Sequence, residues 1–253
     1  MQTIPFAQIA NPLDLSKVNL NAIHTLPLSI ISGYILPYVL IALPSTGTNA
    51  LVSSSLQQIF IAAWSFLPFL IAISQSILQN ITVFYSSPTK VSTVNSPLRK
   101  EAAISTIRRN YAFAFFLSLA THIATLTITF STILFPVLFS PHIIRSLHPR
   151  EIYSLPLSHA SAGSLGVGAL QFLQWDIVVG FTTMLVPAVT SYHRVQNIQA
   201  PKSNLFVLTL KTLGAVVALG PGATLVGVRW LEDEALLFQG AKGGEVAAQG
   251  KRR

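Results

Sequence analysis

One carboxylate, Asp176, lies in the middle of a long run of apolar residues. An ionised group at the centre of a membrane helix costs about 2.5–3.5 kcal/mol on insertion scales. Helical spacing places Asp176 on one face with Gly168, Phe172, Gly180 and Thr183, and this face is small and polar enough to line a cavity. Burial favours the neutral form of a carboxyl group, and a protonated carboxyl in an apolar pocket is a usual general acid. The position therefore predicts Asp176 as a general acid, and the non-catalytic alternative is a hydrogen bond or ion pair between packed helices.

Two other ionisable side chains, Lys211 and His122, lie within apolar runs. An ion pair between Lys211 and Asp176 would hold the carboxyl ionised and spoil it as an acid. We favour the alternative, in which Lys211 extends its ammonium group to the membrane interface. His122 shares a helical stripe with hydroxyl side chains, which fits a hydrogen bond between helices or a contact with substrate. No other histidine lies at metal-ligand spacing from it, so the sequence predicts no metal site.

An acidic cluster, Glu232-Asp233-Glu234, follows Trp230 at the border of the last apolar run. Such a cluster is usually a solvated helix end. It is also a second candidate for catalysis, in which one of its carboxylates orients the substrate or completes proton transfer at the mouth of a pocket.

Four further side chains are candidates for substrate binding. Aromatic rings stabilise cations through their faces, and an amide offers hydrogen bonds inside an apolar segment. The alternative for each of these side chains is lipid contact or core packing. With His122, the candidate substrate-binding residues are Trp64, Gln75, Phe172 and Trp175.

The composition excludes a water-soluble domain of any size. The chain has 253 residues, of which 51% are hydrophobic and 9% are charged, whereas a soluble domain carries about 25% charged residues. No Asp, Glu, Lys or Arg lies between Lys17 and Lys90. The net charge of +8 comes from short loops and the tail, so it does not predict nucleic-acid binding. The absence of cysteine excludes disulfides and thiolate chemistry.

The apolar runs predict an all-α integral membrane protein. A spanning helix needs roughly 20 mostly apolar residues. Six or seven spans are the alternative if segments 1–25 and 138–160 also enter the bilayer. We otherwise expect an interfacial segment over 1–25, a helical membrane domain over 26–230 and a polar, disordered tail over 231–253. Five stretches qualify as spans, and they cover residues 26–43, 57–85, 112–139, 163–187 and 204–230.

The distribution of Lys and Arg predicts the orientation, because cytosolic loops carry the excess of positive charge. With five spans, the side of the N-terminal segment receives eight basic residues, and the other side receives Arg145, Arg150, Arg229 and Lys242. We therefore expect a cytosolic N-terminal segment, a lumenal tail and residence in the endoplasmic reticulum. The eight are Lys17, Lys90, Arg99, Lys100, Arg108, Arg109, Arg194 and Lys202.

Three groups of residues resemble a known family. The first runs from Gly33-Tyr34-Ile35-Leu36-Pro37 to Pro44-Ser45 and Ala63-Trp64, and the second is Gln171-Phe172-Leu173-Gln174-Trp175-Asp176. The third begins at Gly220-Pro221-Gly222 and leads through Arg229-Trp230 to the acidic cluster. Together they resemble small fungal membrane enzymes of secondary-metabolite gene clusters. These include the ascofuranone- and ascochlorin-type terpene cyclases and the hydrolases of aurovertin- and citreoviridin-type polyketide pathways.

This resemblance implies acid-initiated opening of an epoxide inside the membrane. Asp176 resembles the aspartate of the family's penultimate span, and Glu232 to Glu234 resemble its acidic border. The implied enzyme is a terpene cyclase acting on a prenylated aromatic (meroterpenoid) intermediate, and an epoxide hydrolase acting on a polyene polyketide is the alternative. It needs no cofactor, and its expected partners are a lipophilic substrate, the lipid bilayer and other pathway enzymes. A non-catalytic scaffold or a small transporter is the further alternative.

Overall fold

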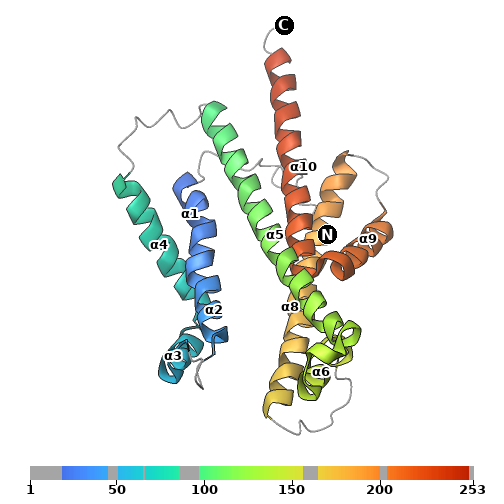
Figure 1. The fold of residues 1–253 in the computed structure, drawn as a ribbon. Coiled ribbons are helices and arrows are strands. Elements are labelled where there is room, and N and C mark those ends of the chain that lie inside the picture. Colours follow the sequence, from blue (N-terminus) through green and yellow to red (C-terminus); the bar gives the residue numbers. More distant parts are fainter. Residues whose placement is uncertain are drawn as a thin grey trace, which may run out of the picture. The chain divides into compact units, whose positions relative to one another are not determined.

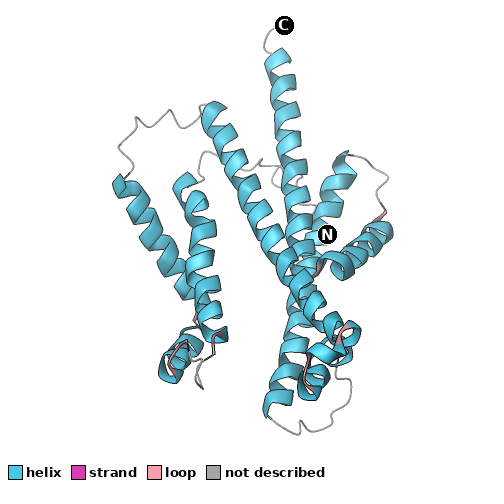
Figure 2. Ribbon diagram, viewed as in Figure 1, coloured by secondary structure: helices cyan, strands magenta, loops and turns pink. Residues whose placement is uncertain are grey.

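The structure, a computed structural model, describes residues 19–44, 51–64, 66–85, 97–155, 165–199 and 204–250. Within these ranges all regular secondary structure is helical and no strand occurs (Figures 1 and 2). The chain divides into two compact units, 1–113 and 114–253, and helix α5 (Pro97–Leu134) contributes to both. The predicted all-α fold is confirmed.

The first unit contains an apolar helical segment over 20–42 and a second, bent segment. The first segment consists of α1 (Leu20–Ile30), a single π-helical turn (Ile31–Ile35) and α2 (Leu36–Ala42). The π-turn directly precedes Pro37, which has no N–H to close the helical bond to Gly33. The bent segment consists of α3 (Ser54–Trp64) and α4 (Leu67–Tyr85), which meet at 88°. The break lies just before Pro68, within the predicted second span.

Small and polar residues allow α1 and α4 to pack closely. A methyl group added to Gly33 would lie 2.9 Å from the backbone of Ile71, so the two helices touch at this point. Ser29 and Thr25 are buried one and two turns earlier, respectively, on the same stripe. Between membrane helices, which gain little from burying apolar surface, such small-residue contacts and side-chain hydrogen bonds provide much of the attraction.

The second unit contains the C-terminal half of α5 and a helical hairpin packed against α8 (Leu165–Gln199). Between α5 and α8 lie a 3₁₀ turn (Pro136–Leu138) and two short helices, α6 (Pro141–Leu147) and α7 (Pro149–Tyr153). The hairpin consists of α9 (Leu205–Leu219) and α10 (Pro221–Gly250). A small apolar core joins α8 to α10 through Ala188, Val189 and Val228.

Gly220 forms the turn of the hairpin, with φ of 86° and ψ of 157°. It lies against His122 of α5, about two thirds of the way along that helix. From there α10 runs parallel to α8, because Gly222 lies near Phe181 and Glu232 bonds to Ser191. The turn is therefore level with the middle of α8, and α10 lies along only the C-terminal half of α8 (Figure 1).

Three helical segments among the described residues are long and apolar enough to cross a membrane, or four if the bent α3–α4 pair is one span. The prediction of five spans was wrong for the last span, 204–230. α9 has 15 residues, about 22 Å, which falls short of a hydrocarbon core of about 30 Å. The chain then reverses at Gly220 instead of continuing. The single spans cover 20–42, 101–134 and 167–198.

The predicted domain limits stay predictions. Residues 1–18 of the predicted interfacial segment lie outside the described residues, and α1 begins at Leu20. The limit at residue 230 falls inside α10, which continues as a helix to Gly250.

Candidate active site

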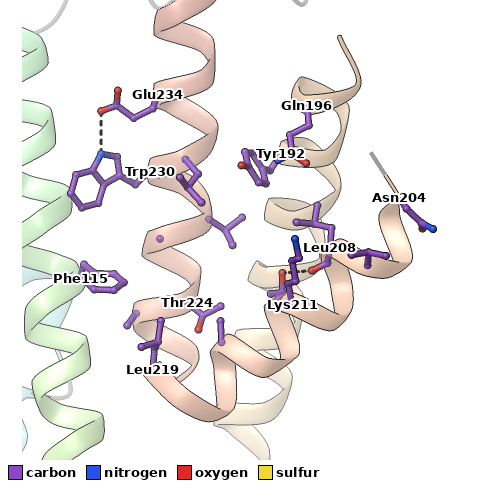
Figure 3. A pocket seen from close by; sticks show the side chains of 17 residues that line it. Phe115, Tyr192, Gln196, Asn204, Leu208, Lys211, Leu219, Thr224, Trp230 and Glu234 are labelled. Carbon is purple, nitrogen blue, oxygen red and sulfur yellow. Dashed lines mark hydrogen bonds between the residues drawn. The ribbon is translucent and has the colours of Figure 1, made fainter. Parts of the chain in front are cut away.

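A cavity of about 990 Å³ lies between α8, α9 and α10 in the second unit, with Phe115 of α5 at its edge (Figure 3). The hairpin forms most of it, because α9 and α10 diverge from the turn at Gly220. Its walls are mainly apolar, and they include Leu208, Ala215, Leu219, Ala223 and Val228. A volume in this range suits a small molecule of drug-like size or larger.

Polar side chains line two separate parts of the cavity. Trp230 and Glu234 lie toward α5, whereas Tyr192, Gln196 and Lys211 lie toward α9 (Figure 3). The indole Nε1–H of Trp230 donates a hydrogen bond of 3.2 Å to Oε1 of Glu234, one turn further along α10. Glu234 is the sole carboxylate among the lining residues. A carboxyl group and a basic side chain thus line different parts of one apolar cavity.

Glu232 is the buried carboxylate of the cluster, with 7% of its surface exposed. It accepts hydrogen bonds from the hydroxyl of Ser191 on α8 and from Nη1 of Arg229 at 2.8 Å. The second bond is also an ion pair, and the Arg229 side chain is 43% exposed. Glu232 does not line the cavity. Through these two partners Glu232 joins α10 to α8.

We expect Arg229→Met to destabilise the second unit by about 2 kcal/mol, because it leaves a buried carboxylate without its cation. The double variant Arg229→Met/Glu232→Gln should recover at least half of this loss, since a neutral amide still accepts the bond from Ser191. Thermal unfolding in detergent, analysed as a double-mutant cycle, measures both effects. Equal stability of the single variant and the wild type would show that the pair contributes nothing.

Asp176 is exposed, so the prediction that it is the buried carboxylate was wrong. The reason is the level of the hairpin turn, which leaves the N-terminal half of α8 without α10 beside it. In that half, Gln174 donates bonds of 2.7 and 2.9 Å to the carbonyls of Glu151 and Ile152, which fixes α7 to α8. Asp176 does not line the cavity and forms no ion pair with Lys211. Its catalytic role stays a prediction.

His122 and Gln75 make structural contacts between helices. Nε2 of His122 lies 3.3 Å from the carbonyl of Val217, one of the unpaired carbonyls in the last turn of α9. Gln75 of α4 bonds to three partners on α1, namely the carbonyl of Ala22, the hydroxyl of Thr25 at 3.0 Å and the hydroxyl of Ser29. These contacts match the non-catalytic alternatives for both residues.

Two other expected site residues, Phe172 and Trp175, do not line the cavity. Phe172 and Trp175 are 69% and 42% exposed on the N-terminal half of α8. The side chain of Trp64 lies outside the described residues, and Asp233 follows Glu232 on α10 without lining the cavity. The substrate-binding roles expected of the aromatic residues stay predictions.

Sequence reasoning missed Tyr192, Gln196 and Ser191. All three follow Pro187 on α8, beyond the limit of the predicted span at residue 187. The helix continues through this proline to Gln199. The spacing of Arg229 and Glu232, three residues apart on a helix, was a readable signal for their ion pair.

The fold defines an all-α membrane protein. Residues 3–237 match the family model described as the CtvD domain, and the chain belongs to this family. This result confirms the resemblance to fungal secondary-metabolite enzymes, because curated relatives from fungi are named terpene cyclases.

Terpene cyclase penA of Penicillium crustosum is 27% identical over 230 residues, which are 90% of this chain and 55% of the relative. Terpene cyclase janA of Penicillium janthinellum is 31% identical over 77% of this chain and 47% of the relative. Terpene cyclase atmA of Aspergillus flavus is 30% identical over 82% of this chain and 53% of the relative. The chain therefore spans about half the length of these relatives. No solved structure matches it.

Proposed function

We propose that this chain is a membrane-embedded enzyme of terpene-cyclase type, which opens an epoxide on a prenylated aromatic substrate by acid catalysis. The observation behind the proposal is the apolar cavity of about 990 Å³, in which Glu234 is the one carboxylate among the lining residues. The names of the curated relatives support the reaction type. We propose the endoplasmic reticulum as its location, with the N-terminal segment in the cytosol.

In this mechanism, the protonated carboxyl of Glu234 gives its proton to the epoxide oxygen. The bond from this oxygen to the more substituted carbon breaks, and the electrons of a neighbouring alkene form a new carbon–carbon bond to that carbon. The final cation is captured by an internal hydroxyl group or loses a proton, and the released proton returns to the Glu234 carboxylate. The product is therefore an isomer of the substrate. The apolar walls favour this outcome, because they keep water away from the cation.

The neighbours of Glu234 fit this role. The bond from Trp230 holds the carboxyl group in one position on α10. The rings of Phe115, Tyr192 and Trp230 line the same cavity, and aromatic faces stabilise cations within about 6 Å. Glu234 replaces Asp176 as our candidate acid because Asp176 lies outside the cavity.

The test is turnover by microsomes that contain the wild-type chain, supplied with an epoxidised prenyl-phenol. Products are followed by mass spectrometry against microsomes lacking the protein. A cyclic product with the mass of the substrate supports the proposal. A product heavier by one water would identify an epoxide hydrolase instead. No turnover of several prenyl-phenol epoxides, by a protein shown to be folded, would favour a scaffold or a transporter.

A further inference from the structure

Three polar side chains on the α9 side of the cavity have no partner among the described residues. Within the part of the chain that the structure describes, the side chains of Tyr192, Gln196 and Lys211 form no hydrogen bond or ion pair. They come from two helices and line the same cavity, where Figure 3 shows them away from Trp230 and Glu234. Convergent polar groups in an otherwise apolar pocket are typical of a site that fixes the orientation of a ligand.

Lys211 is the most informative of the three. It is the only charged residue of α9, whose other residues are apolar or threonine. An ammonium group has three donors and no acceptor, so its complement is an oxygen atom with negative or partial negative charge. The hydroxyl of Tyr192 and the amide of Gln196 can add bonds to the same oxygen.

We propose that Lys211 binds the oxygen-bearing head group of the substrate, with a phenol-type oxygen as the ligand. The isoprenoid tail then lies along the apolar walls, and its epoxide end lies near Glu234. This inference rests on the proposed function for the class of substrate, but it concerns binding and not the chemical step. Lys211 is thus a specificity-determining residue.

The test measures binding without turnover. A radiolabelled prenyl-phenol without an epoxide and the matching prenyl-benzene, which lacks the oxygen, are titrated against the full chain in lipid nanodiscs. We expect the wild type to prefer the phenol by roughly ten- to a hundred-fold, the range of a hydrogen bond to a charged group. Lys211→Met should lose most of this preference. The matched control is Arg194→Met, an exposed basic residue of α8 that does not line the cavity.

Two outcomes would overturn the inference. An unchanged preference in Lys211→Met would show that the ammonium does not contact the head group. Equal weakening of both ligands would show that Lys211 contacts lipid phosphate or supports the fold. A wild type that prefers the phenol through Lys211 but turns over no epoxide would leave this inference standing and remove the proposed function.

A second inference concerns the placement of the hairpin in the membrane, and it rests on lengths and charges alone. From Gly222, near Phe181, to Glu232, bonded to Ser191, α10 and α8 each advance ten residues. Ten helical residues measure about 15 Å, which is half of a hydrocarbon core of about 30 Å. We infer that α9 enters the bilayer from the side on which α8 ends, turns near its middle at Gly220 and leaves on the same side as α10.

The charge distribution supports this re-entrant hairpin. With four spans and a hairpin, Arg229 and Lys242 move to the side of the N-terminal segment. That side then has ten basic residues near the membrane, and the other side has only Arg145 and Arg150. With five spans, the same twelve basic residues are divided eight to four between the two sides. The hairpin therefore satisfies the positive-inside rule better, and it places the acidic cluster at the cytosolic border.

Single cysteines test the hairpin directly, because the chain has none of its own. Gln249→Cys at the end of α10 and Ser146→Cys on α6 are treated with a membrane-impermeant maleimide in sealed microsomes. We expect Gln249→Cys to react at once and Ser146→Cys to react only after the membrane is permeabilised. Reaction of both cysteines at once, or of both only after permeabilisation, would place residues 146 and 249 on the same side of the membrane, which requires a fifth span and overturns the inference.

Discussion

Glu234→Gln should lower the rate of product formation by about 10²- to 10⁴-fold, the usual contribution of a positioned general acid. Glutamine has the size of glutamate, and its amide oxygen still accepts the hydrogen bond from Trp230. The variant therefore removes the proton donor and keeps the shape of the cavity. Turnover of the epoxide in microsomes at matched protein levels measures the effect.

Asp176→Asn is the matched control, because it removes one carboxylate from an exposed position on α8 that does not line the cavity. We expect it to retain at least half of the wild-type rate. Loss of activity in Asp176→Asn with full activity in Glu234→Gln would reverse the assignment. In that case the face of α8 that contains Asp176 and Phe172 would be the site. Binding of the unreactive prenyl-phenol by both variants would show that each remains folded.

The helical fold could be predicted because it depends on local composition. Residues 18–89 have no charge, and their apolar runs are long enough to span a bilayer. The number of spans was wrong because it depends on one backbone conformation. Gly220-Pro221-Gly222 interrupts the last apolar run, 204–230. A sequence alone does not reveal whether such a break kinks a span or reverses it.

The candidate site was predicted less well for the same reason. Asp176 was the predicted acid because it lies in the middle of its apolar run. A residue in the middle of a run is buried only if other helices pack against that part of its helix. The position of the turn at Gly220 determines which half of α8 packs against α10. The residues of α8 and α10 that meet there are far apart in the sequence. The acidic cluster was identified, but the division of roles between Glu232 and Glu234 depends on which face of α10 meets Ser191.

Gly220→Ala should destabilise the second unit by about 3 kcal/mol or more. Its φ of 86° with ψ of 157° belongs to a region that is essentially restricted to glycine and costs other residues about 1–3 kcal/mol. The added methyl group would also lie 2.6 Å from Cγ of His122, closer than carbon atoms approach. Thermal unfolding in detergent, together with prenyl-phenol binding, measures the loss of the hairpin and of the cavity that it encloses.

Two comparisons separate the causes of this loss. Gly214→Ala changes another glycine of α9 at a position where nothing lies within 4 Å of the new methyl group. It should keep or slightly raise stability, because alanine favours a helix by about 1 kcal/mol over glycine. The double variant Gly220→Ala/His122→Ala removes the contact with Cγ of His122 but keeps the contact with Cβ at 2.9 Å and the backbone strain, so it should recover only part of the stability. A Gly220→Ala protein as stable as Gly214→Ala would mean that the chain passes through residue 220 as a continuous helix. The re-entrant hairpin, and with it the cavity between α9 and α10, would then be wrong.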